Sequence, residues 1–270
     1  MSKKSNFLEL NNAKKLWAVG SIHSSLDSFH SIKNYIFSNF EKDDKLIFLG
    51  NLIGFGNNSK EIISEVLSLR FDLMAKFNLK NEDIVFLRGA QEEMFSKLLQ
   101  LQIAPNPIEI IDWIFSHGVD QTILSYNFDP DEFRNVASRG TMQINKLTTK
   151  LNNKISSIPG HKEFFSNLKH AAYSDTKEIL FVNRGVDISR PLSAQNDCFW
   201  WGYQNFSLID KPYYTFKRIV RGYHSNPIND LQNSKSRILC TLFKQPLNNK
   251  NVLAGIFTKN GEILDLFESN

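Results

Sequence analysis

The 270-residue sequence predicts an α/β protein in which two β-sheets pack together and helices cover their outer faces. Three units in the first half each consist of a short apolar run, a glycine and a helix-like segment. The apolar runs, such as LIFL and IVFL, are continuous, which is typical of strands buried on both faces. The second half is strand-like again, and it predicts a second sheet packed on the first.

The three units follow one another between residues 15 and 102. Their predicted strands are KLWAVG (15–20), KLIFLG (45–50) and DIVFLRG (83–89), and the predicted helices cover residues 24–40, 59–77 and 92–102. In the first two helices, apolar residues such as Phe29 and Ile32, or Ile62 and Val66, recur every three or four positions. This spacing predicts one buried face on each helix.

The rest of the chain divides into a helical and a strand-rich part. Residues 105–160, which begin at Pro105, predict a helical insertion over one end of the sheet. Strands are predicted within 178–186, 215–223, 236–243 and 251–268, the last as a hairpin that turns at Asn260-Gly261. Because no low-complexity linker is visible, we expect a single domain over residues 15–270, preceded by an N-terminal extension over residues 1–14.

Composition excludes several classes of protein. The net charge is +4 and 22% of the residues are charged, which excludes an acidic tail protein, a disordered chain and a strongly basic nucleic-acid packager. The two cysteines, Cys198 and Cys240, exclude a disulfide scaffold, and we expect them to be buried structural thiols. The sequence contains neither a signal peptide nor an apolar run long enough to span a membrane. We therefore expect a cytoplasmic protein.

Five loops at predicted strand ends carry the polar residues that would do chemistry, because sites in open α/β sheets lie at the carboxyl ends of strands. They read GSIHS (20–24), GNLIGFG (50–56), GAQE (89–92), NRG (183–185) and GYH (222–224). In order and spacing they resemble the loops GDxHG, GDxxDRG, GNHE, HAG and GHTP of the calcineurin-like metallophosphoesterases. The resemblance is strongest to bacterial phosphoprotein phosphatases and symmetrical diadenosine-tetraphosphate hydrolases. It includes WIFSHGVDQTILSY (113–126) and PLSAQNDCFWWGYQNF (191–206), and it extends over roughly residues 15–265.

The resemblance implies a two-metal phosphoesterase site with divalent manganese, iron or zinc, but most ligand positions hold other residues. Of the ligand positions, only His23 is retained. The first-loop aspartate is Ser21, the bridging aspartate is Asn51, the third-loop asparagine is Ala90, and the last two histidines are Asn183 and Tyr223. Gln91 stands in place of the third-loop histidine, which in the family is the general acid toward the leaving group. We therefore expect no metal cofactor and no catalytic residue. His23, Asn51 and His224, which follows Tyr223 directly, are weak candidates for a single metal ion.

Arginines next to these loops predict a different use of the site. Arg88, Arg184 and Arg221, together with His224, are candidates for binding an anion, because guanidinium groups match phosphate oxygens. The alternative for Arg88 is a structural ion pair. The alternative for Arg184 and Arg221 is that they point to solvent or pair with acids such as Asp187.

Two functional hypotheses follow from these substitutions. The first is a pseudophosphatase that acts as a binding, regulatory or assembly module, whose partner is a phosphorylated protein, a nucleotide or a constitutive subunit of a complex. The alternative is a divergent serine/threonine-phosphatase-like or dinucleoside-polyphosphate hydrolase that uses one metal ion or none. The sequence carries no specific nucleic-acid-binding signal.

Overall fold

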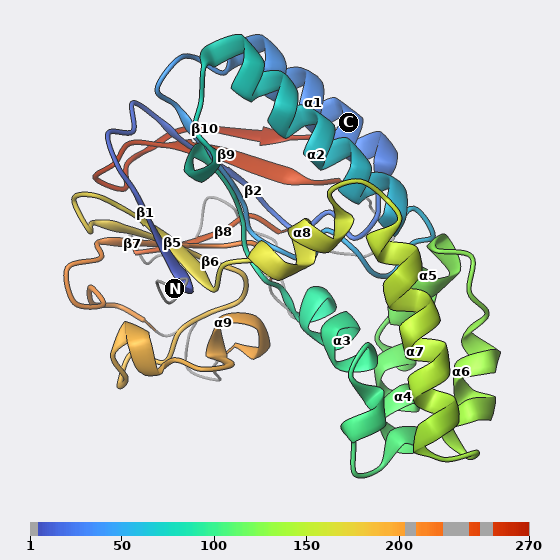
Figure 1. Ribbon diagram of the computed structural model, residues 1–270. Coiled ribbons are helices and arrows are strands. Elements are labelled where there is room, and N and C mark those ends of the chain that lie inside the picture. Colours follow the sequence, from blue (N-terminus) through green and yellow to red (C-terminus); the bar gives the residue numbers. More distant parts are fainter. Residues whose placement is uncertain (1–4, 203–208, 224–237, 244–250, 270) are drawn as a thin grey trace.

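The computed structural model describes residues 5–202, 209–223, 238–243 and 251–269, and its strands form two packed five-stranded sheets (Figure 1). One sheet has the order β1 (Phe7–Leu10), β5 (Ala171–Ser174), β6 (Ile179–Val182), β7 (Arg218–Arg221) and β8 (Leu239–Thr241). The other has the order β10 (Ile263–Glu268), β9 (Leu253–Phe257), β2 (Leu16–Val19), β3 (Lys45–Phe48) and β4 (Ile84–Phe86). The prediction of two packed sheets is confirmed.

Apolar side chains on alternate strand positions build the core between the sheets. Leu16 and Ala18 of β2 belong to the core between the sheets, whereas Trp17 and Val19 pack on the opposite face of β2. Every residue of β2 and β3 is buried. The uninterrupted apolar runs are thus explained, since one face contacts the other sheet and the other face contacts helices.

Two long helices cover the outer face of the sheet that contains β2 (Figure 1). They are α1 (Leu26–Asn39) and α2 (Ser59–Phe77), and their apolar faces are buried as the spacing predicts. Ser25 occupies the N-cap position of α1, but its hydroxyl donates to Ser28 Oγ at 2.9 Å instead of capping a backbone N–H.

The outer face of the other sheet is covered by α9 (Cys198–Trp201) and by the segment 209–216. Phe199 and Trp200 are buried there, and a short 3-10 helix, η3 (Leu192–Ala194), precedes them. Cys198 and Cys240 are both buried and not joined in a disulfide, as expected.

The remaining helices gather beside the sheets, at the lower right of Figure 1. They are α3 (Ala90–Leu98), α4 (Pro107–Ser116), α5 (Val119–Ser125), α6 (Pro130–Ala137) and α7 (Thr141–Ser156), and α8 (His161–Asn167) returns the chain to the sheets. The turns η1 (Asn81–Asp83) and η2 (Leu101–Ile103) precede β4 and α4. Helices therefore occupy most of the segment 105–160. Across the described residues, no helix is both long and apolar enough to cross a membrane.

The N-terminal segment is more than the extension expected from the sequence, because Phe7–Leu10 forms strand β1. This strand pairs in parallel with β5, which the sequence reading also missed. Both strands have only four residues and pair across about 160 positions, so neither carries a local signal strong enough to be recognised. The predicted C-terminal hairpin is confirmed: β9 and β10 are antiparallel, and Gly261 has a φ of 89° in the connecting turn.

Candidate functional site

The five loops meet at one edge of the two sheets. The first loop contacts the second and the fifth, because His23 N donates to Asn51 O at 2.9 Å and Ser21 N donates to Gly222 O at 3.0 Å. Gly222 N in turn donates to Asn183 O of the fourth loop at 2.9 Å. The structure therefore brings these sequence-predicted residues together, as parallel strands with aligned carboxyl ends require. His224 lies outside the described residues.

Asn51 is held in the middle of this cluster with both ends of its amide group in use. Its Oδ1 accepts from Gln91 N at 3.0 Å, and its Nδ2 donates to Ser21 Oγ at 3.2 Å. Asn51 has a φ of 54°, and a side chain at Gly89 would put its Cβ 2.3 Å from Asn51 Oδ1. The acceptor oxygen thus faces the start of α3, and the amide presents N–H groups toward Ser21.

Glu92 organises the second and third loops, a role that the sequence reading did not assign. Its buried carboxylate accepts from the backbone N–H groups of Leu52, Asn51 and Gly89 at 2.8, 2.9 and 2.9 Å. Burial raises the pKa of Glu92, and the backbone N–H donors act in the opposite direction. The sequence signal for this role is a glutamate three positions after Gly89. At that spacing a side chain can accept a hydrogen bond from the backbone N–H of the residue that caps the start of the helix.

His23 sits in an aromatic enclosure. Its ring centroid lies 5.2 Å from that of Phe55, 5.6 Å from Tyr223 and 6.1 Å from Phe243, all in edge-to-face arrangements. Both ring nitrogens are buried, and neither meets hydrogen-bond geometry with any of the described residues. Burial lowers the pKa of His23 to about 4, so the imidazole is neutral at pH 7. Nothing in the loop motifs pointed to Phe55 and Phe243 as its neighbours.

The residues at the other replaced ligand positions, and Gln91 at the general-acid position, serve the loop structure. Asn183 Nδ2 donates to Leu49 O at 2.7 Å, and Gln91 Nε2 donates to His117 O at 2.9 Å, which ties the third loop to the end of α4. Gly54 has a φ of 87°, and a Cβ there would lie 2.1 Å from Gln91 Oε1. Ala90 begins α3 and is buried.

The arginines separate into two groups. Arg88 donates from Nη1 to Glu93 Oε2 at 2.8 Å, which is the structural ion pair considered above. Arg221 is the last residue of β7 and pairs with Val182 at the end of the neighbouring strand β6, and Arg184 lies two positions after Val182. Arg184 places its guanidinium carbon 5.5 Å from the Tyr223 ring centroid.

Arg221 is buried, and its Nε donates to Thr241 Oγ1 at 2.8 Å. Burial, followed by the charge of Arg184, lowers the pKa of Arg221 to about 9. Arg221 therefore does not point to solvent. Asp187 forms an ion pair with Arg190 at 3.0 Å.

The residues in place of the expected ligands do not fit two divalent cations. Such a pair needs carboxylate charge and free lone pairs between the ions, whereas Asn51 is neutral and its oxygen already accepts from Gln91 N. His23 is enclosed by three aromatic rings. Across the residues that the structure describes, no three His, Cys, Asp or Glu side chains form a group that could hold a metal ion.

Comparison with known proteins identifies the fold. No protein-family model and no curated protein sequence matches the chain. A solved structure of a candidate diadenosine tetraphosphatase is similar, with a TM-score of 0.57 and 16% identity over 98% of this chain and 99% of that one. A serine/threonine phosphatase from Saccharomyces cerevisiae is similar with a TM-score of 0.53 and 15% identity over 99% of this chain and 84% of that one. The chain thus has the fold of the calcineurin-like metallophosphoesterases.

Proposed function

We propose that this chain is a pseudophosphatase: a phosphoesterase fold without the two-metal centre, which binds a phosphate-bearing protein or nucleotide as a regulatory or assembly module. Asn51 is the observation that carries this proposal. The position that bridges the two cations in the family presents amide N–H groups toward Ser21, and its oxygen is committed to Gln91 N. The two buried thiols, Cys198 and Cys240, support a reducing cytoplasmic location.

Arg184 and Arg221 support an anion as the ligand. They project from the ends of adjacent strands, and the charge of Arg184 lowers the pKa of the buried Arg221. A buried guanidinium whose charge is disfavoured by burial and by a neighbouring guanidinium is stabilised when an anion binds next to it. Arg88 is left out of this site because Glu93 already pairs with it.

Metal content and hydrolysis test the loss of the two-metal centre. We expect the purified chain to contain far less than one metal ion per molecule by mass spectrometry, even after incubation with manganese. We also expect no turnover of p-nitrophenyl phosphate above that of the variant His23→Ala. Two metal ions per chain, together with a rate that His23→Ala abolishes, would overturn the proposal in favour of a divergent hydrolase.

Inorganic phosphate is the probe for the anion site. Titration calorimetry should detect phosphate binding, and Arg184→Gln should weaken it by about tenfold or more, since a charged hydrogen bond contributes about 1.5–3 kcal/mol. Arg134→Gln is the matched control, because Arg134 lies on α6 and pairs with Asp131. Equal affinities for the wild type and Arg184→Gln, or no phosphate binding at millimolar concentration, would exclude this anion site.

A further inference from the structure

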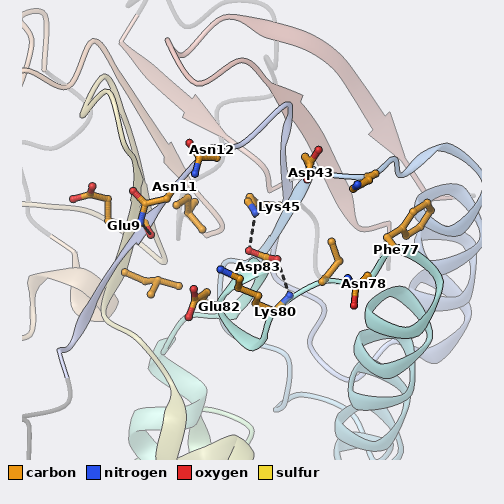
Figure 2. Close-up of a pocket in the computed structure, with 14 residues that line it drawn as sticks. Glu9, Asn11, Asn12, Asp43, Lys45, Phe77, Asn78, Lys80, Glu82 and Asp83 are labelled. Atoms are coloured by element: carbon orange, nitrogen blue, oxygen red, sulfur yellow. Dashed lines mark hydrogen bonds and ion pairs between the residues drawn. The ribbon is translucent and has the colours of Figure 1, made fainter.

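A cleft of about 650 Å³ lies at the opposite end of the sheets from the five loops. Three segments border it: the strand β1 with the residues that follow it, the start of β3, and the chain from the end of α2 through η1. Figure 2 shows Lys45 and Asp83 in the middle of this cleft, with Glu9 and Asn11 on one side and Asn78 on the other. Its volume lies within the usual range for ligand sites, about 300–1,000 Å³.

One wall of the cleft is the edge of a sheet. Among the described strands, β1 ends its sheet and pairs with β5 alone. Five consecutive residues, Leu8 to Asn12, line the cleft. Because side chains alternate between the faces of a strand, consecutive lining residues mean that the cleft runs along the strand edge and meets its backbone.

Hydrogen bonds show which backbone groups face the cleft. The carbonyl of Asn6 accepts from His170 N at 2.8 Å, so the peptide groups of Asn6 and, two residues on, Leu8 point toward β5. Successive residues of a strand point their N–H and C=O groups to opposite sides. The N–H and C=O of Phe7 and Glu9 therefore point away from β5, toward the free edge.

Exposed local side chains already bond three of these four edge groups. Ser5 Oγ donates to the Phe7 carbonyl at 2.9 Å and accepts from the Phe7 N–H at 3.2 Å. The Glu9 carbonyl accepts from the exposed Asn11 Nδ2 at 3.4 Å, a long hydrogen bond. Such contacts keep the edge solvated and can give way to a second strand.

The floor and the far wall of the cleft carry charges of both signs. Lys45 Nζ and Asp83 Oδ1 form a buried ion pair at 2.7 Å, and Asp83 Oδ2 also accepts from Lys80 N at 2.8 Å. Lys80 and Glu82 are exposed on the far wall, across from Glu9. A ligand that fits this lining carries both positive and negative groups.

We propose that this cleft binds an extended peptide segment of another protein, which adds a strand to the free edge of β1. A peptide backbone offers the alternating donors and acceptors that can replace the exposed Ser5 and Asn11 contacts of the Phe7 and Glu9 edge groups. Its side chains can meet the lysines and carboxylates on the far wall. The cleft lies at the amino-terminal ends of β3 and β4, whereas Asn51 lies beyond their carboxyl ends, so this proposal does not depend on the proposed function.

The experiment selects peptides from a random phage-displayed library against the full chain and measures the affinity of the selected peptides by fluorescence anisotropy. Glu9→Pro removes one N–H from the cleft edge and leaves the groups that pair with β5 in place. We expect it to weaken peptide binding by about tenfold. Glu9→Ala is the matched control: it keeps the N–H, and we expect the affinity to stay within about twofold.

Hydrogen exchange on the wild type provides a measurement that does not depend on how Glu9→Pro folds. The Glu9 amide should exchange fast in the free chain and become protected when a selected peptide is added. Peptides that bind Glu9→Pro as tightly as the wild type, a Glu9 amide that stays unprotected, or failure to select any peptide would overturn the proposal. Free glycine, which carries both charges but cannot form a strand, is the small-molecule probe. Binding of free glycine without binding of peptides would overturn the proposal in favour of a small-molecule site.

Discussion

At the scale of single residues, the site is organised by Glu92. Its carboxylate accepts from backbone N–H groups of two loops, so one buried side chain determines how the second and third loops lie against each other. Asn51, whose own N–H is among these donors, is thereby placed to bond both Ser21 and Gln91.

The variant Glu92→Gln should be strongly destabilising, because an amide replaces one acceptor oxygen by a donor that faces a backbone N–H. We expect the free energy of unfolding to fall by about 2–3 kcal/mol, measured by urea denaturation at pH 7. The exposed Glu109 on α4 provides the control, and Glu109→Gln should change stability by less than about 0.5 kcal/mol. A Glu92→Gln chain as stable as the control would show that these backbone N–H groups do not depend on the carboxylate.

At the scale of elements, a hydrogen-bonded chain that is buried at Tyr126 and His161 and ends at the exposed Ser64 joins the end of α5, α8 and α2. The Tyr126 hydroxyl and His161 Nδ1 lie 2.8 Å apart, and His161 Nε2 lies 3.0 Å from Ser64 Oγ. Ser64 Oγ donates to the Lys60 carbonyl at 3.2 Å, so the imidazole donates from Nε2 and accepts from Tyr126 at Nδ1. This pattern needs a neutral ring.

The neutral ring makes stability depend on pH. Burial, then the charge of Lys60, lowers the pKa of His161 from 6.5 to about 4. Between these values the unfolded chain binds a proton that the folded chain does not, so stability is complete above pH 6.5 and decreases as the pH falls toward 4. When the pH falls from 7.5 to 5, the wild type should therefore lose about 2 kcal/mol more stability than a variant without this histidine.

Urea denaturation of the wild type and His161→Gln at these two pH values measures this contribution. Lys162→Gln, at the neighbouring exposed position of α8, is the control, and it should keep the full pH dependence of the wild type. The same loss of stability in wild type and His161→Gln would mean that His161 is already protonated in the folded chain at pH 5.

At the scale of the whole molecule, two sheets with parallel strand ends at one edge explain why five loops from distant parts of the chain meet. The apolar runs of β2, β3 and β4 were recognised from the sequence because each is buried on both faces. The strands β1 and β5 were not recognised, because each is four residues long and depends on the other for pairing. The peptide cleft that we propose lies at β1, so no sequence pattern pointed to it.

The sequence by itself determined the two layers of strands, the helices α1 and α2, and the identity of the residues at the five loops. These features depend on local periodicity and on the order of strands along the chain, both of which are readable without contacts. The tertiary structure alone decided that Asn51 bonds through both ends of its amide, that the Glu92 carboxylate accepts from backbone N–H groups of two loops, and that aromatic rings enclose His23. These contacts join residues far apart in the chain, and their geometry depends on how the sheets pack, for which no local signal exists.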